Sequence, residues 1–178
     1  MFKKILIVVA ALLAVLAIVG VFLPRQWHVV RTIDIAVPAA AIHPFVDDLH
    51  KWADWAAWNK AMDPDVKWTY AGPERGVGAS WAWDGPKMGR GKMTITKSDA
   101  AKGVWVDECI EGDAVNAHGS VEFTEANGNT KVTWTDSGTL PPVVVGYFVG
   151  MINSMLTENF DVGLKGLKTL AEKGAGGK

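Results

Sequence analysis

A long apolar run near the N-terminus constrains this chain more than any other feature. Between Lys4 and Pro24, residues 5–23 contain no polar or charged side chain. As an α-helix rising about 1.5 Å per residue, a run of this length spans roughly 28 Å, which matches the hydrocarbon thickness of a bilayer. A core helix of a soluble protein would carry polar residues at helical spacing, and this run carries none. We therefore predict a single transmembrane anchor over residues 5–23.

The residues that flank this run suggest its orientation. Lys3 and Lys4 belong to a short stub, residues 1–4, that the positive-inside rule places in the cytoplasm. The rest of the chain would then be extracytoplasmic, although Arg25 and His28 reduce the charge asymmetry. Pro24 ends the helix, and residues 24–28 form a linker. The alternative is a cleaved signal peptide, whose apolar region usually has about 7–15 residues and is therefore shorter than this one.

The remainder of the chain has the composition of one folded domain, residues 29–173, followed by a flexible tail, residues 174–178. A net charge of -1 argues against a nucleic-acid partner, because phosphate binding needs a clustered excess of Lys and Arg. The single cysteine, Cys109, excludes an intramolecular disulfide and a cysteine-cluster metal site. The four histidines show no metal-ligand spacing. We therefore expect no metal and no cofactor.

The hydrophobic pattern of this domain predicts an α+β fold. Apolar residues alternate in seven predicted strands, and stripes at helical spacing predict two short helices and one long C-terminal helix. The predicted strands cover residues 29–37, 66–70, 79–83, 92–97, 104–110, 118–125 and 131–137, and the predicted helices cover residues 39–49, 51–60 and 146–172. Asn127-Gly128-Asn129 is a strong hairpin signal, since Asn and Gly tolerate positive φ. A curved antiparallel sheet wrapped on the last helix buries the most apolar area, and such an arrangement often leaves a cavity.

Four segments of the chain resemble the SRPBCC superfamily of START, Bet v 1-like and polyketide cyclase/dehydrase proteins. They are residues 31–38, 48–55, 70–79 and 130–135, and with the closing helix the resemblance covers almost all of the domain. It implies the helix-grip fold and a deep apolar pocket for lipids, polyketides, sterols or similar ligands. The N-terminal anchor is a departure from the soluble prototypes of the superfamily.

Aromatic and methionine side chains are the expected walls of this pocket. Trp52, Trp55 and Trp58 are spaced by three and must cluster, either as an aromatic wall or as core packing. Trp27 suits the aromatic belt at a membrane surface. The expected ligand-binding residues are Arg31, Trp52, Trp55, Tyr70, Trp83, Trp134, Phe148, Met151 and Met155.

Three charged residues have the strand phase of buried neighbours. Asp136 alternates in step with Val132 and Trp134, and Arg31 lies on the apolar face of the first strand. These two strands are neighbours in the helix-grip topology, so we predict that Arg31 meets Asp136. The two residues would form a structural ion pair, or Arg31 would bind the carboxylate or phosphate head group of a ligand. Glu108 shares its phase with apolar neighbours and is a third candidate cavity residue.

The sequence favours membrane-anchored binding of a hydrophobic small molecule or lipid in an internal cavity. A second hypothesis is a metal-free enzyme of the cyclase or aromatase type that uses Asp136 or Glu108 for proton transfer. A third is a protein-interaction module with an apolar groove. His118 is expected to point away from the interior, and Cys109 is expected to be a packed side chain.

Overall fold

The computed structural model describes residues 2–112, 115–141 and 145–176. Met1 of the predicted stub and residues 177–178 of the predicted tail lie outside the described residues. The elements in chain order are α1 (Phe2–Phe22), β1 (Gln26–Ile35), α2 (Ala39–Val46), the 3₁₀ turn η1 (Leu49–Lys51), α3 (Trp52–Trp55), β2 (Lys67–Ala71), β3 (Ser80–Gly85), β4 (Gly89–Asp99), β5 (Gly103–Ile110), β6 (Val115–Ala126), β7 (Asn129–Thr139), the 3₁₀ turn η2 (Val145–Phe148) and α4 (Val149–Gly176).

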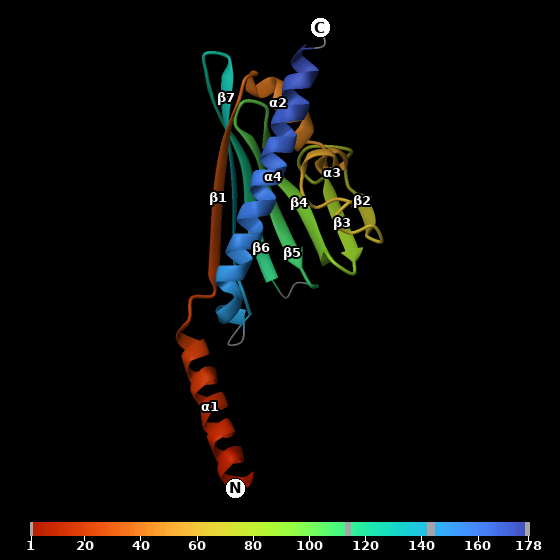
Figure 1. Ribbon diagram of the computed structural model, residues 1–178. Helices are drawn as coiled ribbons and strands as arrows, with labels where there is room; N and C mark the ends of the chain where they lie inside the picture. The colour runs from red at the N-terminus through yellow and green to blue at the C-terminus, as the bar shows by residue number, and fades with distance from the viewer. Residues whose placement is uncertain (1, 113–114, 142–144, 177–178) are drawn as a thin grey trace.

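The strands form one antiparallel sheet, and the predicted α+β helix-grip fold is confirmed. Within the described residues the sheet has seven strands in the order β1-β7-β6-β5-β4-β3-β2, so the first strand pairs with the last. Helix α4 crosses one face of this sheet, and α2 and α3 lie on the same side (Figure 1). A register shift between Ile95 and Lys97 marks an irregularity in β4, and such bulges bend a strand.

The core lies between α4 and the inner face of the sheet. Residues of alternating position on β1 and β7 are buried, including Val29, Ile35 and Val132. Helix α4 contributes Leu164 and Leu167 to the same cluster. Burial of such side chains stabilises a fold by about 25 cal/mol per Å² of apolar area, so this face fixes the position of α4 over the sheet.

The predicted hairpin turn is present between β6 and β7. Asn127 and Gly128 have φ values of 54° and 76°, and Ala126 pairs directly with Asn129. This is the two-residue loop with positive φ at both central positions that Asn-Gly favours. Its short length sets the register of β7 against β6.

Several predicted element boundaries were wrong. The helix predicted over residues 51–60 is reduced to η1 and the four-residue α3, because Ala56 adopts an extended conformation (φ -73°, ψ 155°). The Asn59 side chain then accepts hydrogen bonds from the next turn, at the N–H groups of Ala61 and Met62. Strand β1 begins at Gln26, inside the predicted linker, and α4 continues to Gly176, inside the predicted tail.

Helix α1 extends away from the domain at the end opposite to α2 (Figure 1). Its segment Phe2–Gly20 is long and apolar enough to cross a membrane, and its residues are exposed apart from Gly20 at the domain end. An N-terminal signal sequence would have the same properties. The Tyr147 hydroxyl of η2 donates a hydrogen bond to the backbone carbonyl of Leu16, at 2.5 Å.

Candidate functional site

A cavity of about 290 Å³ lies between the inner face of the sheet and the first half of α4. Its walls come from β1, β3, β4, β5, β6 and β7, from α3 and the loop after it, and from α4. The described residues that line it are Trp27, Trp52, Trp58, Trp81, Trp83, Met88, Met93, Glu108, Ile110, Val115, Trp134, Asp136, Leu140, Ile152, Met155, Leu156 and Phe160.

Indole rings make up much of this wall, since six of the described lining residues are tryptophan. The Trp134 ring stacks on Phe160 of α4 with centroids 4.0 Å apart, and Trp58 and Trp52 meet Trp134 edge-on at 5.9 Å and 5.8 Å. Such offset and edge-to-face contacts stabilise aromatic clusters beyond the area that they bury. The rings therefore pack against one another and still leave a hollow.

Two carboxyl groups face this hollow, those of Glu108 on β5 and Asp136 on β7. Strand β6 runs between them and presents small residues there: Ala117 pairs with Glu108, and Gly119 pairs with Asp136. A Cβ atom at Gly119 would lie 3.5 Å from an Asp136 oxygen. The small residues on β6 therefore leave room for both carboxyl groups on one side of the sheet.

Trp27 holds the Asp136 carboxylate in place. Its indole Nε1–H donates a buried hydrogen bond of 2.5 Å to Asp136 Oδ1. The ring lies over Gly138, where a Cβ atom would come within 2.2 Å of two indole carbons. A side chain at position 138 would therefore collide with the indole ring in the position from which it bonds Asp136.

The environment changes the protonation of both carboxyl groups. Burial of the Glu108 carboxyl, together with the negative charge of Asp136, raises the pKa of Glu108 to about 8. Burial also raises the pKa of Asp136, although the hydrogen bond from Trp27 and the nearby His118 and His28 oppose that rise. The pair therefore retains a proton near neutral pH, because two adjacent carboxylates repel each other in an apolar site.

The structure brings some of the predicted ligand-binding residues to the cavity and places others elsewhere. Trp52, Trp83, Trp134 and Met155 line it, as do both candidate acids. Trp55 is buried behind the wall, with its ring 5.1 Å from that of Trp134.

Three predicted lining residues lie away from the cavity. Tyr70 stacks on His50 at 4.0 Å beside a separate hollow at the β2–β3 end of the sheet. Phe148 and Met151 are exposed, at 46% and 63%. On α4 the wall is formed by Ile152, Leu156 and Phe160, which are spaced by four, and Met151 lies off that stripe.

The predicted pairing of Arg31 with Asp136 was wrong. Arg31 Nε and a second guanidinium nitrogen donate hydrogen bonds to the carboxylate of Asp161 on α4, at 2.6 Å and 2.9 Å. This ion pair is partly exposed, and the charge and hydrogen bonds of Asp161 raise the pKa of Arg31 further. In the β1–β7 register Arg31 lies opposite Trp134, whereas Asp136 lies opposite Val29. The covering helix, not the neighbouring strand, supplies the partner of Arg31.

Trp27 was assigned from the sequence to the membrane interface, and its role in the cavity was missed. The signal was present in the strand phase, since Trp27 alternates in step with the buried Val29. His118 was expected to point away from the interior, and this is confirmed, because it is exposed and its Nδ1 lies 2.6 Å from Asp107.

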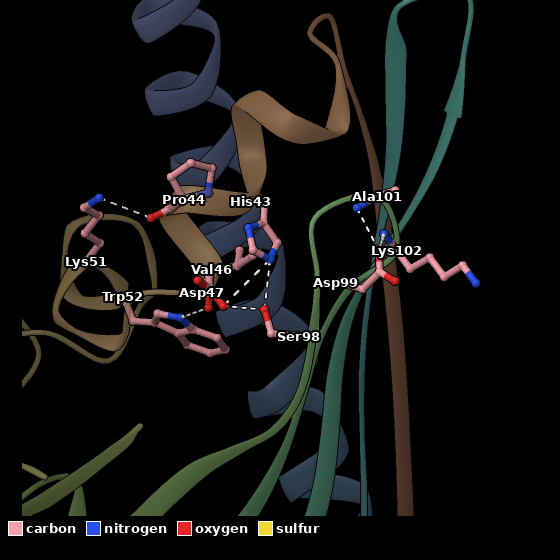
Figure 2. Close-up of polar contacts among 10 residues, drawn as sticks. All are labelled: His43, Pro44, Val46, Asp47, Lys51, Trp52, Ser98, Asp99, Ala101 and Lys102. Carbon is pink, nitrogen blue, oxygen red and sulfur yellow. Dashed lines mark hydrogen bonds and ion pairs between the residues drawn. The ribbon is translucent and has the colours of Figure 1, made fainter. Parts of the chain in front are cut away.

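A separate polar cluster joins α2 to β4 (Figure 2). His43 Nε2 lies 3.0 Å from Ser98 Oγ and 3.7 Å from Asp47 Oδ1, and the Ser98 hydroxyl donates a hydrogen bond to Asp47. In a catalytic triad the histidine uses one ring nitrogen for the serine and the other for the aspartate. Here one nitrogen faces both groups, so we interpret the cluster as a link that holds α2 against the sheet.

The comparisons with known proteins agree with this architecture. Residues 26–172 match the model of a family described as polyketide cyclase / dehydrase and lipid transport. No curated protein matches the chain.

Solved structures share the fold at low sequence identity. Ara h 8.0201 has a TM-score of 0.57 at 10% identity, with 82% of this chain and 97% of that chain covered. The hypothetical protein jhp0584 of Helicobacter pylori has a TM-score of 0.63 at 6% identity, with 82% and 88% covered. TTHA0849 of Thermus thermophilus has a TM-score of 0.57 at 18% identity, with 82% and 97% covered. At these identities the likeness concerns the fold alone.

Proposed function

Because the chain belongs to the polyketide cyclase / dehydrase and lipid transport family, we propose that its domain binds a hydrophobic small molecule or lipid in the cavity beneath α4. The fold and the family match both support the resemblance to the SRPBCC superfamily. We propose residues 5–23 as the anchor, and we move the expected limits of the binding domain from residues 29–173 to residues 26–176, because β1 begins at Gln26, carries Trp27 of the cavity wall, and α4 continues to Gly176.

The observation that favours binding is the hollow itself. A tryptophan-rich interior of this size would be filled by its own side chains if the rings were only core, yet about 290 Å³ remains between them. This volume is near the lower end of the range typical of small-molecule sites, about 300–1,000 Å³. Its lining is apolar apart from Glu108, Asp136 and the indole N–H groups, which is the composition of a site that binds by burial and orients its ligand through a few polar groups.

Exposed apolar residues at the α1 end of the domain support the proposed membrane location. Tyr147, Phe148, Met151 and Met155 are 44–63% exposed and lie on η2 and the first turns of α4, beside α1. An exposed apolar patch of this kind suits the interface region of a bilayer. Met155 also lines the cavity, so the patch is continuous with the ligand site. We propose that the N-terminus is cytoplasmic and that the domain lies against the opposite membrane surface.

A metal-free acid–base enzyme is the second candidate function. The observation that favours it is the carboxyl group of Glu108, whose pKa of about 8 allows it to donate or accept a proton at neutral pH. Turnover of a supplied polyketide-like substrate that is lost in Glu108→Gln would favour the enzyme. Binding of that substrate without turnover would favour the binding function proposed above.

Mass spectrometry of small molecules that co-purify with the full-length protein tests the proposed function. Ile152→Trp adds an indole to the cavity wall on α4 and should reduce the recovered ligand at least fivefold. Ser154→Trp is the matched control, because Ser154 lies on the exposed side of the same helix and its variant should retain the ligand. Equal recovery from both variants would place the ligand outside the cavity and contradict the proposal.

A further inference from the structure

Both charged residues of the described cavity lining are acids, whereas the sequence had also predicted Arg31 beside them. Arg31, the predicted partner for an acidic head group, is engaged by Asp161 at the surface. The charged residues among the described lining residues are Glu108 and Asp136, and none of that lining is Lys, Arg or His. A carboxylate or phosphate ligand would therefore meet two acids in an apolar site, which is unfavourable.

The aromatic walls have the same electrostatic preference as the two acids. The face of an indole ring is electron-rich, and a cation within about 6 Å of the ring centroid is attracted to it. Six tryptophans line the described part of the wall, including Trp81 and Trp83, whose centroids are 5.5 Å apart. Tryptophan is the ring that binds cations most strongly, and a desolvated site strengthens the attraction. Six indoles and two carboxyl groups that line one cavity form an environment suited to a positively charged group.

We propose that the cavity binds a lipophilic cation, an amine or quaternary ammonium compound whose charged end lies against Glu108 and Asp136 while its apolar part packs among the indoles. This inference rests on the proposed function, because it names the ligand class of the same cavity. The volume of about 290 Å³ fits one small aromatic or short-chain amine and is too small for a whole two-chain lipid.

Binding of such a cation is coupled to release of a proton. The carboxyl pair retains a proton near neutral pH, and a bound positive charge favours the doubly ionised pair, so the proton passes to solvent. Titratable groups that alternate with the lining residues on these strands are exposed on the opposite face of the sheet: His28, Asp84, Arg90, Lys92, Asp107 and His118. Of these, His28 and His118 still act on Asp136 through their charge, which favours its ionised form. On α4, Asp161 is held by Arg31. The cation affinity should therefore rise with pH. A probe with a permanent charge does not titrate itself, so any pH dependence of its affinity comes from the protein.

Three probes of nearly the same shape test the proposal. They are benzyltrimethylammonium, its neutral carbon isostere neopentylbenzene, and the anion benzylsulfonate. Each is titrated into the full-length protein in phosphatidylcholine nanodiscs, with empty nanodiscs as the blank, and binding is followed by tryptophan fluorescence. At pH 8.5 we expect the cation to bind at least tenfold more tightly than the neutral probe and the anion to bind more weakly than both. Between pH 8.5 and pH 6 the cation affinity should fall at least threefold while the neutral probe is unchanged.

Two variants locate the preference. Glu108→Gln should remove most of the pH dependence and most of the preference for the cation while it retains neutral-probe binding. Asp84→Asn, on the exposed side of β3, should behave as wild type. If the wild-type protein binds the neutral probe or the anion as tightly as the cation, the cation proposal is wrong and hydrophobic binding stands. If it binds none of the three, both proposals are overturned. The wild-type comparison needs no variant, so it decides the question even if Glu108→Gln fails to fold.

Discussion

Replacing Glu108 with Gln should stabilise the ligand-free protein, and the gain should grow with pH. When folding raises the pKa of a carboxyl group, the ionised form of that group is less stable in the folded protein than in the unfolded chain. The free energy of unfolding is therefore highest below the unfolded pKa and decreases as the pH rises to the folded pKa. For Glu108 these values are 4.5 and about 8. Wild type and Glu108→Gln should therefore have similar stability near pH 4.5 and diverge up to about pH 8.

The size of the effect follows from the same shift. At about 1.4 kcal/mol per pKa unit, a rise from 4.5 to about 8 sets an upper limit of roughly 5 kcal/mol. The cavity has room for water beside Glu108 and Asp136, and water there would solvate the ionised group and lower this penalty. We therefore expect Glu108→Gln to gain about 2 kcal/mol over wild type at pH 8.5.

Urea unfolding of the full-length protein in a mild detergent, followed by tryptophan fluorescence at several pH values, measures this difference. The matched control is Glu158→Gln, because Glu158 is exposed on α4 and its removal should change stability by less than about 0.5 kcal/mol at every pH. A constant difference between Glu108→Gln and wild type from pH 4.5 to pH 8.5 would refute the reasoning. It would mean that the Glu108 carboxyl is solvated as well in the folded protein as in the unfolded chain.

Three further substitutions test other contacts by the same unfolding assay. Trp27→Phe removes the indole donor of Asp136 and should cost about 1–3 kcal/mol at pH 7, since it leaves a buried acceptor unsatisfied; no loss would mean that water replaces the indole. Arg31→Met breaks a partly exposed ion pair with Asp161, so it should cost less than about 1 kcal/mol and leave ligand recovery unchanged; loss of the ligand would return Arg31 to the site. Gly128→Ala meets no neighbouring atom within 4 Å, so its expected cost of about 1 kcal/mol comes from the positive φ alone; a neutral effect would show that the hairpin tolerates another turn.

Strand phase was the most reliable guide to the candidate site. Val104, Val106 and Glu108 alternate along β5, and their period-two pattern predicted that the Glu108 carboxyl faces the interior. The same rule applied to β1 would have brought Trp27 to the cavity beside Val29. Trp27 was missed because the strand begins at Gln26, earlier than predicted, and β1 extends there by pairing with the end of β7.

Strand phase does not predict the contacts between the sheet and the helices. The phase of Arg31 was right, and the side chain is directed to the covered face, yet its partner is Asp161 from a helix 130 residues later in the sequence. Phe148 and Met151 share the apolar character of the α4 stripe, but the rotation of α4 over the sheet leaves them exposed. No local pattern specifies that rotation, because it depends on how the buried residues of α4 fit the sheet.

The local properties of the sequence determined the apolar helix, the seven strands, the Asn-Gly turn and the inward phase of Glu108 and Asp136. Each of these follows from the polarity and backbone preference of residues within one element. Tertiary structure decided that small residues of β6 lie between the two acids and that the indole rings leave a hollow. It also decided the partners, since Trp27 bonds Asp136 and Asp161 bonds Arg31. These outcomes depend on side chains from distant elements that meet in three dimensions, and packing at that scale is set by all the contacting surfaces together.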